Sequence, residues 1–457
     1  MSFGRTRLIP CIIVLLLVFS CSRENDTSEA WDPATIVSTS VLKERRGYHV
    51  SKGIIHAHSV YSHDACDNQP FINNEPNYQC LLDLRKAICT TKQSFIMLTD
   101  HTGTMADEDN FANLLLFDEG DELIYRNEKP VANRMHCDGG ASSVIMVGVE
   151  DSPTPLGLEK HVSDDVSERK AIYGSDFDYI TKTTIYHQKG AVVIITHPED
   201  PTIEEIREHK VDGMEIYNTH YNLISDLSAI SNLAPFLSTS SKAPHPDLAF
   251  LAFFTENAIY IDRWNTMLAE QKMAGVGGTD VHQNTFPTLL RDGERADSYR
   301  RLMKWFSNNV LVKEDSDIAY KEAVKAGRLY VAFEAFGMPI GFDFYANGSD
   351  GLTYEMGGEV PSGVTAGIVA KFPRIYGGQG FDEMPEISTR IIRIPPAGAA
   401  EEVASGTNDI LIEDAQPGAY RAEVWIVPWH LKKWLGTEPL QFIREHIWIY
   451  SNPIYVK

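Results

Sequence analysis

The stretch at residues 54–64, IIHAHSVYSHD, constrains this chain more than any other. Two isoleucines lead into His56 and His58, which stand two positions apart. On a β-strand, side chains two positions apart point to the same face and lie about 7 Å from each other along it. Two imidazoles on one face of a strand end can chelate one metal ion. The stretch therefore predicts a buried strand that delivers a pair of metal-ligating histidines.

Later in the chain, short apolar runs repeatedly end on a residue that can bind metal. A helix or a long insertion separates each run from the next, and this alternation favours a parallel α/β fold. When a parallel barrel closes, the carboxyl ends of its strands meet at one rim. We therefore expect ligands from distant parts of the chain to converge there. The runs lead into TDH at 99–101, GVE at 148–150, THP at 196–198, EIYNTH at 215–220 and GTDVH at 278–282.

The ligand types indicate the metals and the chemistry. Imidazoles and carboxylates without a thiolate suit two or three divalent ions such as Mn, Zn or Fe rather than a structural zinc. Paired metals generate hydroxide and clamp the attacked oxygens, which is hydrolytic chemistry. The chain has no G-x-S-x-G elbow, P-loop or Rossmann fingerprint. The predicted metal ligands are His56, His58, Asp64, His101, Glu150, His197, His220, Asp280 and His282.

These motifs, in this order, resemble the PHP family, named for polymerase and histidinol phosphatase. The resemblance covers residues 50 to about 335 and is greatest to exported, carbaryl-hydrolase-like members that carry a C-terminal β domain. It implies a distorted seven-stranded β/α barrel with a dinuclear or trinuclear metal site.

The resemblance also implies how the ligands are shared. His56 and His58 would hold one metal with Glu150 and Asp280, whereas His101 and His197 would hold another with Glu150 as the bridge. Asp64, His220 and His282 would complete a third position or the open side. Asp100 would orient a ligand histidine, and Asp280, His220 and Asp100 are the expected catalytic residues. Two choices stay open, His63 against Asp64 and Asn218 against His220, of which Asp64 and His220 are preferred.

We expect a metal-dependent hydrolase, foremost a phosphoesterase that cleaves a phosphodiester or phosphomonoester by attack of a metal-bound hydroxide. Its substrate would be a small-molecule, lipid-linked or carbohydrate-linked phosphoester. Arg291 and Arg295 follow the last motif and are candidate phosphate contacts, although a solvated helix start is the favoured explanation for them. The same site would also suit an ester, amide or carbamate hydrolase. A non-catalytic, metal-binding surface lipoprotein is the third hypothesis.

The first 21 residues resemble a lipoprotein signal peptide. Arg5 and Arg7 precede an apolar core at residues 8–19, and Cys21 follows a small residue. We therefore expect an exported protein that is anchored to a membrane through lipidated Cys21 and faces the periplasm or the cell surface. Ordinary secretion with nearby cleavage is the alternative, because Phe19 is larger than the usual residue there. Residues 22–50 are polar and acidic, as in a tether.

Four cysteines remain after the signal peptide, and an even number in an exported chain suggests up to two disulfides. Three pairings are possible among Cys66, Cys80, Cys89 and Cys137, and four free cysteines are the alternative. The formal net charge of −22 argues against a nucleic-acid partner. We divide the folded part into a metallohydrolase domain at 51–335 and a small antiparallel β-sandwich at 336–457, where short β-like runs alternate with Gly, Pro and Asn.

Overall fold

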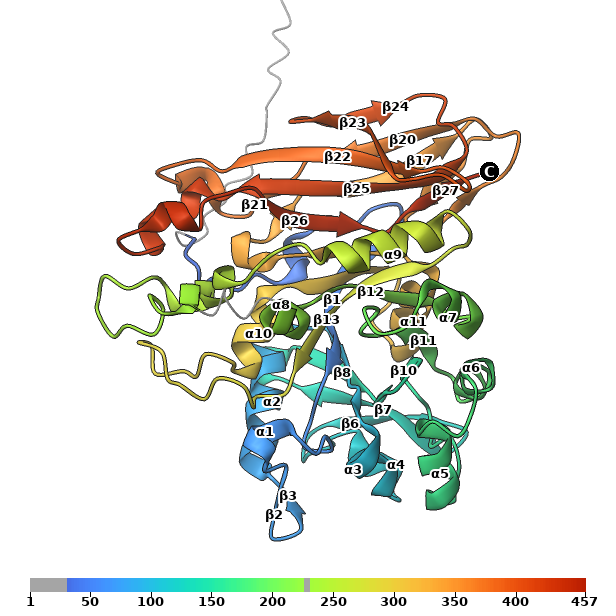
Figure 1. Cartoon of the computed structure of the whole chain (residues 1–457), viewed down its shortest axis with the longest axis vertical. Coiled ribbons are helices and arrows are strands. Elements are labelled where there is room, and N and C mark those ends of the chain that lie inside the picture. Colours follow the sequence, from blue (N-terminus) through green and yellow to red (C-terminus); the bar gives the residue numbers. More distant parts are fainter. Residues whose placement is uncertain (1–30, 226–230) are drawn as a thin grey trace, which may run out of the picture.

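A computed structural model of the chain describes residues 31–225 and 231–457 (Figure 1). The expected signal peptide, Cys21 and the first part of the expected tether lie outside these residues. Within the described ranges, no helix combines the length and the apolar character that crossing a bilayer requires.

Parallel strands form the centre of the fold, and β1 lies between two of them. It pairs with β4 on one side and with β13 on the other. β8 continues the parallel order beyond β4, whereas β12 and β11 continue it beyond β13. These strands are β1 (His49–Ala57), β4 (Phe95–Met97), β8 (Ser142–Met146), β11 (Val192–Ile195), β12 (Gly213–Asn218) and β13 (Ala274–Val281).

The ends of this parallel order approach each other through β10 (Thr154–Leu156). β10 pairs with β11, but in the antiparallel sense. Just beyond it, an isolated bridge joins Leu158 to Val147 at the end of β8. The predicted α/β class is confirmed by this mixture of helices and a large sheet. A distorted seven-stranded barrel stays a prediction.

Helices connect the strands, and several begin at a side chain that caps them. The Asn77 carboxamide accepts from Cys80 N before α2, and Thr202 forms a capping box with Glu205 before α7. Figure 1 shows these helices on the outside of the central strands. The helices are α1 (Ala65–Asn68), α2 (Tyr78–Thr90), α3 (Thr102–Asp107), α4 (Phe111–Leu114), α5 (Val166–Tyr173), α6 (Tyr179–Gln188), α7 (Ile203–His209), α8 (Thr219–Ser225), α9 (Ala258–Leu268), α10 (Tyr299–Trp305) and α11 (Asp317–Ala326).

The insertion at residues 102–142 contains more β-structure than its sequence suggested. Besides α3 and α4 it forms the hairpin of β6 (Glu122–Arg126) and β7 (Lys129–His136), and β7 pairs antiparallel with β8. The prediction of disulfides is confirmed, with Cys66 bonded to Cys80 and Cys89 bonded to Cys137. The second bond ties α2 to the end of the hairpin, and a small hairpin, β2 (Phe71–Ile72) with β3 (Glu75–Pro76), lies within the loop closed by the first.

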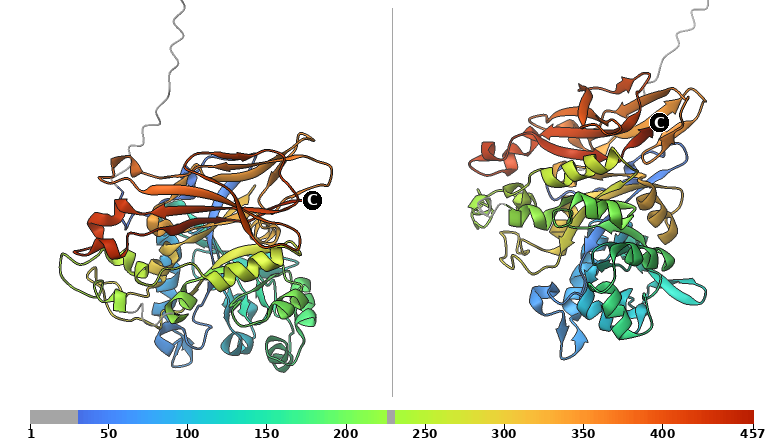
Figure 2. Two further views of the ribbon diagram at one scale, coloured as in Figure 1. Left: turned by 45° about the horizontal axis from the view of Figure 1, so that its top comes forward. Right: turned by 45° about the vertical axis from the view of Figure 1, so that its right-hand side comes forward.

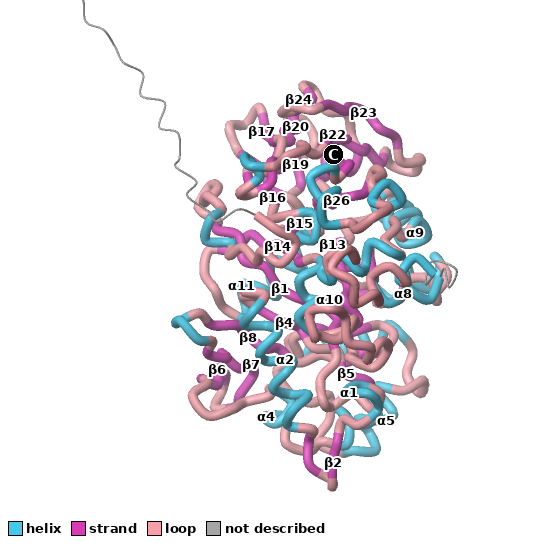
Figure 3. Tube along the Cα trace, turned by 90° about the vertical axis from the view of Figure 1, so that its left-hand side faces the viewer, coloured by secondary structure: helices cyan, strands magenta, loops and turns pink. Residues whose placement is uncertain are grey.

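The large sheet continues from the central strands into the C-terminal part. β14 (Ser307–Val312) pairs antiparallel with β1, β15 (Leu329–Ala332) pairs with β14, and β26 (His446–Ser451) pairs with β15. Figures 2 and 3 show the C-terminal strands gathered at one end of the molecule. Because this pairing is continuous, the division into two domains at residue 335 and the separate sandwich stay predictions.

Two sets of strands make up this C-terminal part. One belongs to the large sheet: β19 (Glu359–Val360), β22 (Glu386–Ile394), β23 (Glu401–Gly406), β25 (Gly418–Val427) and β27 (Ile454–Val456). The other is a four-stranded antiparallel sheet of β18 (Thr353–Glu355), β17 (Asp343–Gly348), β20 (Ala366–Lys371) and β24 (Ile410–Ile412). A further short pair joins β16 (Pro339–Ile340) to β21 (Arg374–Ile375).

Residues 31–50, the described part of the expected tether, lie against the folded chain. Trp31 is 5% exposed, and its ring centroid lies 5.4 Å from that of Phe381 and 5.6 Å from that of Trp434. The Lys92 ammonium donates to the Ile36 carbonyl. Such contacts hold the segment on the surface, unlike a free tether.

Candidate metal centre

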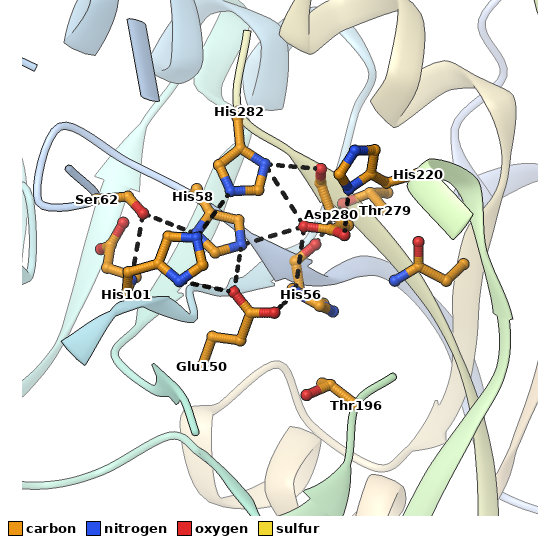
Figure 4. Close-up of polar contacts among 12 residues, drawn as sticks. His56, His58, Ser62, His101, Glu150, Thr196, His220, Thr279, Asp280 and His282 are labelled. Atoms are coloured by element: carbon orange, nitrogen blue, oxygen red, sulfur yellow. Dashed lines mark hydrogen bonds and ion pairs between the residues drawn. The ribbon is translucent and has the colours of Figure 1, made fainter. Parts of the chain in front are cut away.

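The structure brings all the predicted metal ligands together at the carboxyl ends of the central strands. Figure 4 shows His56, His58, His101, Glu150, His220, Asp280 and His282 among them. His56 is the penultimate residue of β1, and Asp280 is the penultimate residue of β13. His101 and Glu150 are directly paired, because β5 (Asp100–His101) and β9 (Val149–Glu150) form a short parallel ladder. The convergence follows from the parallel order of the strands.

The ligand atoms form two tetrads that share Glu150. In each tetrad, the ligand atoms all lie within 4.8 Å of one another. A third, overlapping group combines His63 and Asp64 with His101, so the structure keeps both alternatives for that position near the site. We call the first set tetrad 1, His56, Glu150, His197 and Asp280, and the second tetrad 2, His58, His101, Glu150 and His282.

The family resemblance implied that His56 and His58 share a metal with Glu150 and Asp280, and this division of the ligands stays a prediction. The two histidines belong to different tetrads, but Asp280 Oδ1 lies 3.4 Å from His56 Nε2 and 3.3 Å from His58 Nε2. His58 stacks on His282, with ring centroids 3.7 Å apart, and its centroid lies 4.8 Å from that of His101. The stacking turns His58 toward tetrad 2, while His56 lies beside His197.

Glu150 lies between the tetrads and faces each with a different oxygen. Its Oε1 lies 3.0 Å from His197 Nε2 and 3.5 Å from His56 Nε2. Its Oε2 lies 3.0 Å from His101 Nδ1 and 3.4 Å from His58 Nε2. A carboxylate in this position can bridge two cations.

Four histidines point their Nε2 atoms toward the tetrads because their Nδ1 atoms are held from outside. His56 Nδ1 donates to Glu215 Oε1 at 2.6 Å, and His58 Nδ1 donates to the Ser62 hydroxyl at 3.0 Å. His197 and His282 are held in the same way, by Glu199 at 3.1 Å and by the Asp280 carbonyl at 3.0 Å. Outer hydrogen bonds of this kind select the tautomer and orient metal-ligating imidazoles.

Buried polar atoms without a hydrogen-bond partner lie inside the tetrads. His56 Nε2, His58 Nε2, Glu150 Oε2 and Asp280 Oδ1 all belong to this class. Each lies within 3.5 Å of another ligand atom of the site, but none of them makes a hydrogen bond. Nitrogen lone pairs and carboxylate oxygens that converge on one point fit a divalent cation, so these residues suit the implied metals.

Three of the ligands adopt backbone conformations that residues other than glycine rarely adopt. The φ angles of His56, His197 and Asp280 are 60°, 47° and 53°. Left-handed backbone at such residues costs free energy, and it is concentrated at functional sites. The turn at His56 is held by Thr279, whose hydroxyl donates to the His56 carbonyl at 2.6 Å.

Electrostatics keep the carboxylates of the site anionic. Burial would raise the pKa of Asp280 and Glu150, but the surrounding histidines hold both well below the usual range. Burial would lower the pKa of His56, yet Glu215 and Asp280 raise it to about 10. Burial and the neighbouring His282 lower the pKa of His58 to about 3. A cation therefore finds anionic carboxylates and a neutral His58, but it must displace a proton from His56 when it binds there.

Asp100 and Asn218 were both considered for the site, and the structure gives them other contacts. Asp100 was expected to orient a ligand histidine, but it accepts from Ser59 N at 2.5 Å and from the Ser59 hydroxyl at 2.8 Å. It therefore holds the turn after β1 instead. Burial raises the pKa of Asp100 to about 6. Asn218 donates to Glu215 at 3.2 Å, away from the tetrads.

His220 lies at the margin of the site. Its Nδ1 is 3.1 Å from Asp280 Oδ2, and its side chain is 38% exposed. It belongs to neither tetrad. The two arginines considered for phosphate binding are engaged elsewhere: Arg295 pairs with Asp67 and Asp297, and Arg291 donates to a backbone carbonyl.

Three residues that hold the ligand imidazoles were not assigned a role from the sequence: Glu199, Ser62 and Glu215. Glu199 follows His197 by two positions, and Ser62 lies between the histidine pair and Asp64. Ser62 also accepts from His101 N at 3.2 Å and donates to Asp64 at 3.1 Å. Their proximity to the ligands in the sequence was the only available signal.

Two cavities adjoin the tetrads. One, of about 390 Å³, is lined by His101, Glu150 and His197 together with Asp200 and Glu205. The other, of about 30 Å³, is lined by His220, Asp280 and His282 and by apolar side chains. The site is therefore open to a polar, acidic space and also to a small apolar one.

No protein-family model and no curated protein matches this chain. Among solved structures, the chain resembles a two-domain protein from Bacteroides vulgatus that contains a predicted PHP-like metal-dependent phosphoesterase. The two are 11% identical, and the alignment covers 90% of this chain and 98% of the other with a TM-score of 0.36. A likeness this low carries no argument about fold or function.

Proposed function

We propose that this protein is a metal-dependent hydrolase of phosphoesters, built as a PHP-type barrel. The observation that carries the proposal is the pair of tetrads that share Glu150 and contain four buried polar atoms without a hydrogen bond. We further propose two or three divalent ions, with Mn, Zn or Fe as candidates, because the ligands are imidazoles and carboxylates.

Metals bound there would polarise a phosphoryl oxygen and activate water. The chain's own residues would supply the rest of the chemistry. Glu150 would keep the two cations close, while Glu215, Ser62 and Glu199 keep the ligand imidazoles in one orientation. Hydrolysis forms a bond from the water oxygen to phosphorus and breaks the bond to the leaving oxygen, which must gain a proton. His220 lies beside Asp280 and is partly exposed, so it is placed to deliver that proton.

We also propose export and membrane anchoring through Cys21, on the strength of the N-terminal sequence, together with two domains that meet near residue 335. The substrate would be a small or lipid- or carbohydrate-linked phosphoester. The overall charge of −22 continues to disfavour nucleic acids.

The test combines metal content with hydrolysis, using the full chain. Asp280→Asn keeps the shape of the side chain but removes the charge that tetrad 1 requires. We expect at least two metal equivalents in the wild type, cleavage of bis(p-nitrophenyl) phosphate, and loss of both in the variant. His136→Ala, at an exposed histidine outside the site, is the matched control and should retain both.

A wild-type protein that binds none of Mn²⁺, Zn²⁺ and Fe²⁺ would refute the proposal. Cleavage of p-nitrophenyl acetate or an aryl carbamate, with no cleavage of phosphoesters, would instead support hydrolysis of carboxyl esters or carbamates at the same tetrads. Firm metal binding without any hydrolysis would support a binding protein.

A further inference from the structure

A small apolar pocket opens directly beside the tetrads, and we call it the alkyl pocket. One side of it consists of polar groups of the site, including His220, Asp280 and His282. The remaining wall is apolar and consists of Leu223, Phe250, Phe253, Phe286 and Leu302.

The walls of the alkyl pocket are firmly held. Phe250 and Phe253 pack against each other with centroids 5.3 Å apart, and Phe250 also packs on Trp305 at 5.6 Å. Both phenylalanines are 5% exposed. Because they are already packed in place, the pocket is preformed and a ligand need not order its walls.

Phe286 closes the pocket from a loop that is fixed through its backbone. The Asp297 carboxylate accepts from Phe286 N at 2.8 Å and from Thr285 N at 2.7 Å. Arg295 neutralises this carboxylate, with Nε 2.6 Å from Asp297 Oδ1. This explains why Arg295 does not reach the tetrads.

The size of the alkyl pocket limits what it can hold. Its volume is about 30 Å³, and one water-sized group needs roughly 10–15 Å³ by this measure. It has room for about two non-hydrogen atoms. Apolar walls favour an apolar occupant, because each methylene removed from water contributes about 0.8 kcal/mol, or a factor of about four in affinity.

We propose that the alkyl pocket binds a short apolar arm of the substrate, so that the substrate is a phosphodiester with one methyl or ethyl-sized arm. This inference rests on the proposed phosphoesterase function. A monoester has a single arm, which leaves, whereas a diester keeps its second arm on phosphorus. Water's oxygen bonds to phosphorus, the bond to the leaving oxygen breaks and that oxygen is protonated, and the product is an alkyl phosphate.

The cavity of about 390 Å³ on the other side is a poor place for the apolar arm. Glu150, Asp200 and Glu205 line it along with Asp151. It suits the larger, polar leaving group, and its carboxylates disfavour a leaving group that carries further phosphates. The two cavities therefore distinguish the two arms of an asymmetric diester.

The experiment compares the methyl, ethyl and n-butyl esters of p-nitrophenyl phosphate on the metal-loaded full chain. We expect kcat/KM to rise about fourfold from methyl to ethyl, and n-butyl to gain nothing more because the pocket is full. Phe253→Ala enlarges the pocket and should make n-butyl the best of the three. Phe286→Ala, at a half-buried side chain whose backbone stays bound to Asp297, provides a second variant if Phe253→Ala folds poorly. Phe381→Ala, half-buried in the C-terminal part, should leave the order unchanged.

Equal kcat/KM for all three esters, in the wild type and in both pocket variants, would overturn the inference while leaving phosphodiester hydrolysis intact. If no ester is cleaved, binding takes over as the readout, with alkylphosphonates and the Mn²⁺-loaded protein. In the wild type, ethylphosphonate should then raise the melting temperature more than methylphosphonate does. In Phe253→Ala, butylphosphonate should raise it most. This result would support the pocket and contradict the proposed activity. No preference among the phosphonates would overturn the pocket as well.

Discussion

Gly278→Ala is the sharpest test of how the tetrads are held, because the change is one methyl group. Gly278 lies in β13, paired with Ile55 of β1 and with Asn218 of β12. A Cβ built at this position overlaps Glu215 Oε1, lies 2.6 Å from its Cδ and lies 3.3 Å from His56 Nδ1. Glu215 is fully buried, so it has no solvent to move into. The variant must therefore push Glu215 away from His56 or shift β13.

The expected magnitude follows from what Glu215 does. It accepts from His56 Nδ1 at 2.6 Å and from His197 N at 3.1 Å, so it orients two ligands of tetrad 1. Loss of such an outer partner lowers metal affinity by about 10- to 100-fold, which corresponds to about 1.4–2.8 kcal/mol. Disrupting a buried charged pair also lowers the free energy of unfolding by about 3–5 kcal/mol.

The assay is competitive Zn²⁺ or Mn²⁺ titration of the full chain, accompanied by urea unfolding. Gly103→Ala is the matched control: it lies two residues from His101, its Cβ would meet nothing within 4 Å, and α3 accepts alanine readily. Glu215→Gln separates the two causes, because it removes the charge without a clash and should reduce affinity by a smaller factor. A folded Gly278→Ala protein that binds metal within twofold of the wild type would refute this account of the tetrads.

Two further predictions concern stability. Replacing Cys89 and Cys137 by serine should lower the free energy of unfolding by about 4 kcal/mol, because this bond closes a loop of 48 residues. Removing the Cys66–Cys80 bond should lower it by about 3 kcal/mol, because that loop spans 14 residues. Equal losses in urea unfolding would contradict the loop-entropy argument. Burial would raise the pKa of Asp247, but Lys304, Arg300 and Arg301 lower it to about 2, below the ordinary 3.8. Its contribution to stability is therefore complete above about pH 4 and is lost as the pH falls toward 2. Asp247→Asn should be less stable at pH 7 and should lose less stability than the wild type between pH 4 and 2; parallel unfolding curves would count against this.

The convergence of the ligands was predictable from the sequence because it depends on simple periodicity. Short apolar runs such as residues 95–98 are typical of strands buried on both faces, as in a parallel sheet, and the side chains that follow such strands lie at one edge. The α/β class and the residues at the strand ends follow from this rule. The disulfides were predictable in number, since four cysteines remained, but not in pairing, which depends on where α2 and the β6–β7 hairpin meet.

The C-terminal pairing was out of reach for a different reason. β15 pairs with β26, more than a hundred residues later, and no local pattern specifies a partner at such a distance. The antiparallel direction of β10 could not be predicted either, because a strand of three residues carries no sequence pattern that specifies its direction.

The division of ligands between the tetrads could not be predicted because it depends on the backbone after each strand ends. His56 and His58 would share one face if β1 continued as a regular strand. At His56 the chain instead adopts a φ of 60°, and the register between β1 and β13 shifts between Ile55 and Ala57. The two Nε2 atoms nevertheless approach one oxygen, Asp280 Oδ1, at 3.4 Å from His56 and 3.3 Å from His58.

The same irregularity connects the strain of the site to its ligands. Left-handed backbone at His56, His197 and Asp280 costs free energy in each case, and four buried ligand atoms make no hydrogen bond although ion-pair partners lie within 3.5 Å. A cation that accepts the lone pairs of His56, His58, Glu150 and Asp280 would offset part of these costs, so metal binding and folding stability should be coupled at this site. The left-handed turns at the strand ends are therefore best explained by function, because they orient side chains from different strands toward shared cations.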